Sequence, residues 1–130
     1  FDVILVDGSD PVGPAAGLFD AGFYRACARA LTERGVLATQ SESPILTRDL
    51  FLDIQRALAA AFERVVPLLG PAPLYAAEQW SWTLCSNGVD PLAVRDARAD
   101  AIEPGSEIYH RELHRAAAVL PSYLRRLVGR

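Results

Sequence analysis

The chain has 130 residues and a formal net charge of −3, and 51% of its residues are apolar and 22% charged. This length suits one compact domain or part of a larger one, since domains commonly have roughly 100–150 residues. The apolar content argues against a disordered tail, and charges that interrupt the apolar runs argue against a membrane-spanning helix of about 20 residues. The mild acidity argues against a polyanion, so we expect neither a nucleic-acid nor a membrane partner.

The chain begins with Phe1 and contains no methionine. Its first residues read as a core strand and not as a signal peptide, because no charged segment precedes the apolar run and no small-residue cleavage site follows it. We therefore expect the carboxy-terminal part of a longer protein. Cys27 and Cys85 show no CxxC spacing, which favours reduced thiols and a cytoplasmic location.

The first half of the chain alternates strand-like and helix-like segments. Val3–Val6 has the pattern of a strand buried on both faces of a parallel sheet, and residues 36–39 form a second strand. A helix between them should stop before Gly35. Its predicted apolar face consists of Phe19, Phe23, Cys27 and Ala30. Thr47 is a candidate N-cap of a second helix, whose apolar stripe consists of Phe51, Ile54, Leu58 and Phe62.

The second half is expected to add two strands and short helices. Residues 64–69 read as a third strand, in which Pro67 indicates an edge position or a bulge, and residues 80–85 alternate as a fourth. Asp90 and the following proline predict the start of a short helix. Two helical segments follow, at residues 106–120 and 121–128. This order predicts an α/β fold with a mostly parallel sheet and a late antiparallel strand added by a hairpin.

Two carboxylates lie on the loop that follows the first strand. Asp7 and Asp10 flank a Gly-Ser turn, and open α/β sheets bind ligands at the carboxyl ends of their strands. By residue type, the pair can bind a cation, hold a metal or act as a base, and ordinary turn capping is the alternative. We predict no metal site, because no third carboxylate lies near them in the sequence.

The equivalent loop after the second strand carries Gln40 and Glu42. If the two strands adjoin, these side chains and the two aspartates line one acidic crevice, whereas a solvated loop is the alternative. A third loop supplies Tyr75 as a candidate pocket wall. Trp82, on the strand that follows it, is expected in the core.

His110 and His114 have the spacing that places two side chains on one helix face. The zinc-protease pattern fails because Arg111 occupies the position of its glutamate. We therefore expect a capped or packed helix here. The sequence contains no Walker loop, GxGxxG segment or GxSxG segment.

Four ordered segments make up a wider pattern. They are FDVILVDGSDPVGPAAGLF, ATQSESP, PAPLY followed by WSWTL, and EIYHRELHRAAAVLPSYLRRLV. Together they resemble the spermidine synthases, the polyamine aminopropyltransferases, whose signature reads close to D-(S/C)-(S/T)-D-P-x-G-P-(A/G)-x-x-L-F. The resemblance implies the second half of a Rossmann-like, class I methyltransferase-type fold. It also implies that the family's N-terminal β-domain and Gly-rich nucleoside-binding half are absent.

The resemblance further implies a reaction in polyamine biosynthesis. An aminopropyl group moves from decarboxylated S-adenosylmethionine to a diamine, commonly putrescine, and spermidine and methylthioadenosine are released. By position, Asp7 matches the catalytic base, which also contacts the co-substrate, and Asp10 matches the carboxylate that grips the amine. Pro14 and Ala15 match the loop that lines the nucleoside. Three further residues match the family's polyamine crevice, namely Gln40, Tyr75 and Trp80.

No cofactor beyond the co-substrate is implied, and family members are usually homodimers or homotetramers. Gly8 departs from the serine or cysteine that is usual at its position. After Tyr75 the chain reads Ala-Ala-Glu-Gln where many members have Pro-Ser-Gly, and the extra Glu78 can favour a longer or differently charged amine.

Two other functions stay open. A methyltransferase of the same fold would use ordinary S-adenosylmethionine, but a second carboxylate at Asp10 suits a diamine better than most methyl acceptors. A non-catalytic relative would serve as a binding or dimerisation module, but the chain retains Asp7, Asp10 and Tyr75. On any of these readings the isolated fragment is expected to be inactive.

Overall fold

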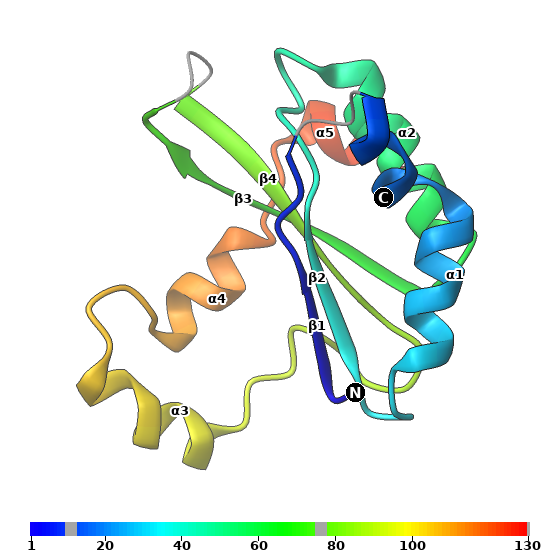
Figure 1. The fold of residues 1–130 in the computed structure, drawn as a ribbon. Coiled ribbons are helices and arrows are strands. Elements are labelled where there is room, and N and C mark those ends of the chain that lie inside the picture. Colours follow the sequence, from blue (N-terminus) through cyan, green and yellow to red (C-terminus); the bar gives the residue numbers. More distant parts are fainter. Residues whose placement is uncertain (10–12, 75–77, 130) are drawn as a thin grey trace.

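The computed structural model describes residues 1–9, 13–74 and 78–129. Its sheet has four strands in the order β1 (Val3–Val6), β2 (Val36–Gln40), β4 (Glu78–Ser86) and β3 (Arg64–Ala72). β1 and β2 are parallel, and β4 is antiparallel to both of its neighbours. β4 thus runs against the other strands, which confirms the expected mixed sheet with one late antiparallel strand (Figure 1). β3 lies at one end of the sheet, as Pro67 predicted.

The helices form two groups. A 3₁₀ helix, η1 (Gly13–Phe19), leads into α1 (Ala21–Ala30), which lies with α2 (Arg48–Ala59) on one side of the sheet (Figure 1). After β4 the chain forms α3 (Asp96–Ile102), η2 (Glu103–Gly105), α4 (Arg111–Ala117) and α5 (Ser122–Leu127). α3 and α4 lie on the other side of the sheet, and α5 returns to α2. Within the described part of the chain, no helix has the length and apolar character that crossing a bilayer requires.

The main core lies between the sheet and the helices α1 and α2. The stripe predicted for α2 is confirmed, since Phe51, Ile54, Leu58 and Phe62 are all buried. The face predicted for α1 is partly wrong, because Ala30 is exposed and Tyr24 is fully buried in its place. Desolvation raises the pKa of the Tyr24 hydroxyl to about 12. The Tyr24 ring therefore belongs to the core. The sequence prediction overlooked it because tyrosine carries a polar hydroxyl group.

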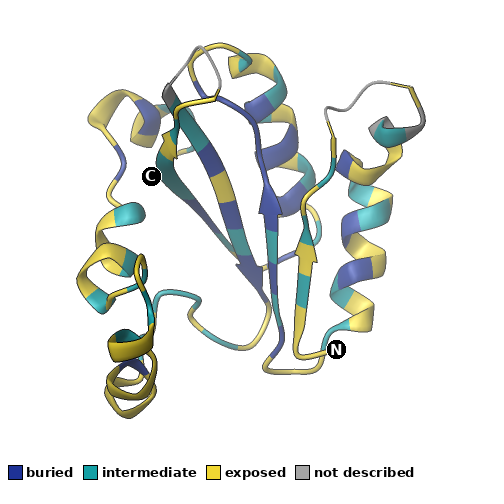
Figure 2. Cartoon of the chain, turned by 60° about the vertical axis from the view of Figure 1, so that its left-hand side comes forward, coloured by how far each residue is buried: buried dark blue, intermediate teal, exposed yellow. Residues whose placement is uncertain are grey.

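β1 is buried on one face and not on both. Ile4 and Val6 pack against the main core, whereas Val3 and Leu5 are 58% and 75% exposed (Figure 2). β1 lies at the end of the described sheet, where it pairs only with β2. An unbroken apolar run does not distinguish a strand covered on both faces from one covered on one, so the expectation of two buried faces is wrong here.

Trp82 is 37% exposed, so the prediction that it lies in the core is also wrong. The register pairs Trp82 with Gln40 and Leu68, on the sheet face opposite α1 and α2. A Cβ at Gly70 would lie only 2.8 Å from Cζ3 of Trp82. Glycine therefore gives the indole ring room to lie across the neighbouring strand.

The helices after β4 are shorter than predicted, and two of them begin later in the chain. Asp90 accepts a hydrogen bond from the backbone N–H of Leu92 at 3.0 Å, but this cap closes a turn, and the first helix begins only at Asp96. Ser106 likewise accepts from the N–H of Tyr109 at 2.8 Å, and the helix predicted from residue 106 begins at Arg111. Short polar side chains cap turns as well as helices, which explains both errors.

A buried polar network joins α2 to β4 and to Ser41, the residue that follows β2. Thr83 is fully buried, and its Oγ1 lies 2.8 Å from both Nε2 of Gln55 and Oγ of Ser41. Thr83→Val keeps the shape of the side chain but takes this partner from two buried polar groups. We expect the free energy of unfolding, measured with urea, to fall by about 1–3 kcal/mol. Thr83→Ser keeps the hydroxyl and serves as the control, so equal losses in both variants would contradict a role for the network.

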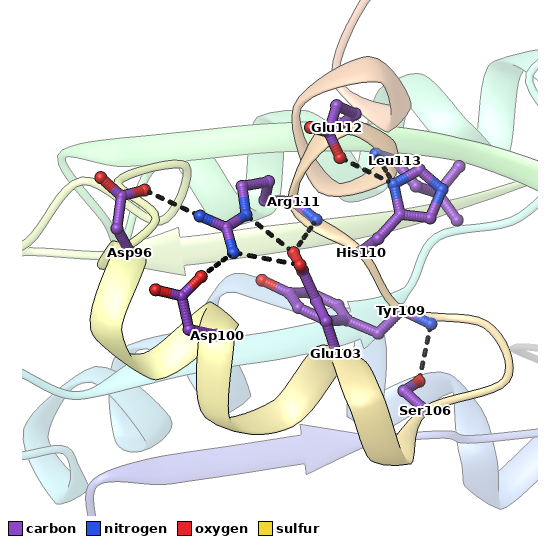
Figure 3. Close-up of polar contacts among 9 residues, drawn as sticks. All are labelled: Asp96, Asp100, Glu103, Ser106, Tyr109, His110, Arg111, Glu112 and Leu113. Atoms are coloured by element: carbon purple, nitrogen blue, oxygen red, sulfur yellow. Dashed lines mark hydrogen bonds and ion pairs between the residues drawn. The ribbon is translucent and has the colours of Figure 1, made fainter.

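One arginine joins α3 to α4 (Figure 3). Arg111 donates from Nε to Glu103 at 2.9 Å and from Nη1 to Asp96 at 3.4 Å, and its Nη2 also pairs with Asp100. His110 caps α4, because its Nδ1 accepts from the N–H of Leu113 at 3.2 Å. This geometry confirms the capped helix predicted around the two histidines.

Arg111→Met is expected to loosen α3 and α4 while the sheet stays folded, because three carboxylates then face one another without a cation. Hydrogen exchange should show lower protection in both helices. The Arg111 guanidinium lowers the pKa of Glu103 from its ordinary value of 4.5, so the pair contributes stability above about that pH and loses it as the pH falls through the lowered pKa. The protection difference between variant and parent should therefore shrink in acid. Equal protection at neutral pH would show that the pairs do not hold the helices.

Candidate active site

The carboxyl ends of β1 and β2 lie next to each other. The parallel register pairs Val6 with Thr39, so the loops that follow both strands start from the same edge of the sheet. Nε2 of Gln40 donates a hydrogen bond to the carbonyl oxygen of Gly8 at 3.4 Å. This bond joins the two loops and confirms the predicted proximity of the polar segments that follow the strands.

Asp7 follows β1 directly, and its side chain is exposed at this edge. Gly8 packs against the ring of Phe19, and a Cβ at Gly8 would lie 3.4 Å from that ring, which is an ordinary contact. The structure therefore accommodates the larger residues that the resemblance associates with position 8. Asp10 and Tyr75, both predicted to bind the amine, lie outside the described residues.

The two residues predicted to line the nucleoside belong to η1. Gly13 precedes them with a φ of 60°, a left-handed conformation that glycine adopts readily. Ala15 is half-buried, and the side chain of Pro14 lies outside what the structure describes. η1 ends at the buried Phe19, so the same short helix connects this loop to the core.

Gln40 connects three segments of the chain. Its Oε1 accepts from the backbone N–H of Glu42 at 3.0 Å and from the indole N–H of Trp80 at 3.1 Å. Its Nε2 donates to Oε1 of Glu42 at 3.1 Å and to Gly8. The amide thereby links the loops after β1 and β2 to β4, and it brings Trp80, a predicted amine-binding residue, to the same place.

Glu42 turns its carboxyl group into the protein. It is 2% exposed and Gln40 is 6% exposed, so the alternative of a solvated loop is wrong. Oε2 of Glu42 accepts from the Thr47 hydroxyl at 3.3 Å, and the backbone carbonyl of Glu42 accepts from the N–H and the hydroxyl of Ser81 at 3.0 and 2.7 Å. Thr47 stands at the predicted N-cap position but makes no side-chain cap bond to α2.

Sequence reasoning missed Ser81 and misread Thr47. The available signal for Ser81 is its place between Trp80 and Trp82 on an alternating strand, which puts a small polar residue on the inner face. The Thr47 side chain forms bonds to Ser43 as well as Glu42 and so braces the loop that precedes α2. The sequence does not reveal whether a threonine before a helix caps the helix or bonds to the preceding loop.

The site and the two histidines lie in different parts of the fold. His114 bonds the Pro91 carbonyl through Nε2 at 3.1 Å and packs edge-on against Tyr109. Among the residues that the structure describes, no group of three or more His, Cys, Asp or Glu side chains is arranged to hold a metal ion. The described groups at the site are the Asp7 carboxylate, the Gln40 amide and the Trp80 indole.

The chain is similar to known proteins over nearly all of its length. A model of the spermine/spermidine synthase domain matches residues 1–95, which include both strand-end loops and Trp80. A polyamine aminopropyltransferase of Bacillus subtilis (strain 168) is 38% identical over 98% of this chain and 46% of its own length. One of Prochlorococcus marinus (strain MIT 9313) is 42% identical over 97% of this chain and 45% of its own length.

Solved structures give the same result. A spermidine synthase in complex with the transition-state analogue AdoDATO superposes with a TM-score of 0.92 at 31% identity, over 99% of this chain and 45% of the other. The spermidine synthase of Thermotoga maritima has a TM-score of 0.86 at 31% identity, over 99% of this chain and 44% of its own. The chain spans about half the length of these relatives. With the matched domain covering both loops of the site, the chain belongs to the spermine/spermidine synthase family.

Proposed function

We propose that the chain is the carboxy-terminal half of a polyamine aminopropyltransferase. The enzyme transfers an aminopropyl group from decarboxylated S-adenosylmethionine to putrescine and releases spermidine and methylthioadenosine. The observation that carries the proposal is the bond from Gln40 to the Gly8 carbonyl, since it holds the loop of Asp7 beside Glu42 and Trp80 at one sheet edge. The relatives are about twice as long as this chain, and we assign the rest of the nucleoside site to a preceding half.

The first task of the site is to attract a protonated amine. An aliphatic amine of the lysine type has a pKa of about 10, so putrescine arrives as a dication at neutral pH. Asp7 is exposed at the sheet edge, where it can meet the incoming charge. We assign the second ammonium group to Asp10, and the methylene chain to a wall made of Gln40, Tyr75 and Trp80, because an aromatic face suits both the chain and its cationic end.

The second task is to free one nitrogen for attack. Asp7 accepts a proton from the amine as a general base. The nitrogen lone pair then forms a bond to the aminopropyl carbon beside the sulfonium sulfur, the C–S bond breaks, and its electron pair stays on sulfur as a neutral thioether. Holding the nitrogen and this carbon in line supplies much of the rate, since the sulfonium is already a good leaving group. The step requires no metal.

The co-substrate is a substrate and not a resident cofactor. We place its nucleoside against Asp7, Pro14 and Ala15, the segment that leads from β1 into η1. The full-length enzyme is proposed to be a cytoplasmic homodimer or homotetramer. Cys27 and Cys85 are both buried in the described structure.

Product analysis tests the reaction. The full-length protein that contains this chain is incubated with decarboxylated or ordinary S-adenosylmethionine and a panel of amines, and the products are identified by mass. We expect methylthioadenosine and putrescine enlarged by one aminopropyl group, from the decarboxylated form alone. S-adenosylhomocysteine would instead identify a methyltransferase, and neither product would identify a binding module. The isolated chain of 130 residues is expected to show no turnover, and turnover by it would contradict a site divided between two halves.

A further inference from the structure

Glu42 has a backbone conformation that glycine favours. Its φ is 68°, and among the described residues it is the only non-glycine residue with a positive φ. Its side chain is also buried. Left-handed backbone at a residue with a Cβ is strained, and a buried carboxyl group loses its hydration. Both costs persist only where the surrounding structure holds the residue in place.

The contacts of Glu42 show what its carboxyl group faces. Ser81 fixes the backbone from β4, through two hydrogen bonds to the Glu42 carbonyl. The carboxyl group then meets the Gln40 amide at 3.1 Å and the Thr47 hydroxyl at 3.3 Å. None of the ion pairs among the described residues includes Glu42. The strained backbone therefore aims the carboxyl group at an amide and a hydroxyl of the protein itself.

These contacts settle which way the Gln40 amide points. The indole N–H of Trp80 and the backbone N–H of Glu42 can only donate, so the amide turns its oxygen toward them. Its two N–H groups then face the Glu42 carboxylate and the Gly8 carbonyl. A carboxylate accepts strong hydrogen bonds and donates none. If the Gln40 amide were flipped, its oxygen would face the carboxylate oxygen, so the carboxylate favours the observed orientation.

We propose that Glu42 is a positioning residue that acts through Gln40. Its carboxylate orients the Gln40 amide, the amide holds the Gly8 carbonyl, and the Gly8 carbonyl sets the position of the neighbouring Asp7. This inference rests on the proposed function, because it assigns Asp7 to proton transfer. The charge of Glu42 then serves the protein's own amide and does not bind the diamine.

Paired variants separate positioning from amine binding. Glu42→Ala removes the acceptor, and we expect kcat to fall by about 10²-fold, a loss typical of small misplacements of reacting groups. The amine KM should rise as well, because Gln40 and Trp80 line the proposed amine wall, and both effects should be reversed in Glu42→Gln. Glu42→Gln should restore most of kcat. The new amide oxygen can accept from Gln40, and its N–H₂ can donate to Oγ1 of Thr47. The Thr47 hydroxyl then turns its hydrogen from position 42 to its other acceptor, the Ser43 carbonyl at 3.0 Å.

A direct amine contact would give a different pattern. Glu42→Gln would then raise the amine KM as much as Glu42→Ala does, because both variants lack the charge, and this result would overturn the proposal. An unchanged kcat in Glu42→Ala would also overturn it. If the alanine variant does not fold, Glu42→Gly replaces it, since glycine adopts the left-handed backbone without strain.

A readout that needs no turnover separates this proposal from the proposed reaction. The indole N–H of Trp80 gives its own NMR resonance, which is assigned by its disappearance in Trp80→Phe. In the full-length protein, Glu42→Ala should shift this resonance and speed its exchange with solvent, and Glu42→Gln should do neither. An unchanged Trp80 resonance in Glu42→Ala overturns the positioning role, whether or not aminopropyl transfer is observed.

Discussion

Asp7→Asn is expected to lower kcat by about 10²- to 10⁴-fold, the usual range for the loss of a positioned general base. Asparagine has nearly the same shape and still accepts hydrogen bonds, but it does not take the proton from the amine. Because Asp7 is exposed at the end of β1, its replacement should leave the melting temperature unchanged. Steady-state kinetics of the full-length protein, with decarboxylated S-adenosylmethionine and putrescine, measure the effect.

Two further substitutions make the Asp7 result specific. Asp10→Asn should mainly raise the amine KM, because Asp10 is proposed to bind the second ammonium group and not to take a proton. Asp49→Asn removes the same charge from an exposed residue in the first turn of α2 and should change neither constant. Unchanged turnover in Asp7→Asn would remove Asp7 from the role of base, and equal losses in all three variants would point to the net charge.

Phe51→Ala is expected to lower the free energy of unfolding by about 3–5 kcal/mol, a loss typical of truncating a buried phenylalanine. Phe51 is 1% exposed and forms a buried cluster with Leu120 and Leu124, which holds α5 against α2. Domains of this kind have total stabilities of about 5–15 kcal/mol, so the variant loses a large share. Urea unfolding, followed by circular dichroism, measures the change.

Phe51→Leu is the matched variant, because leucine fills much of the volume that alanine leaves empty. It should lose clearly less stability than the alanine variant. Hydrogen exchange in both should show the loss of protection concentrated in α5 and the start of α2. Equal stability of the parent and Phe51→Ala would mean that this cluster does not stabilise the fold.

Several elements could be predicted because local pattern decides them. The stripe of α2 repeats at helical spacing, so the buried face of that helix follows from the chain alone. Pro67 lacks the N–H that a central strand needs, so an end position for β3 followed as well. The position of Asp7 directly after a short β-branched strand was sufficient to place it at the carboxyl edge of the sheet.

Burial could not be predicted in the same way. Val3, Leu5 and Trp82 are as apolar as any core residue, yet each is exposed because it lies on the sheet face away from α1 and α2. Which face of a strand is covered depends on where the later helices pack. That packing is decided by residues distant in the sequence, so the hydrophobic pattern of the strand itself does not predict it.

The same division applies to the site. The order of strands and loops, the family resemblance and the candidate side chains Asp7, Gln40 and Trp80 could be taken from the sequence, because short motifs carry them. The burial of Glu42, its left-handed backbone and the four hydrogen bonds of the Gln40 amide arise only when β1, β2 and β4 come together. Hydrogen-bond partners that are distant in the sequence are chosen by packing, which is why Glu42 reads as a loop residue in the chain and as a buried orienting group in the fold.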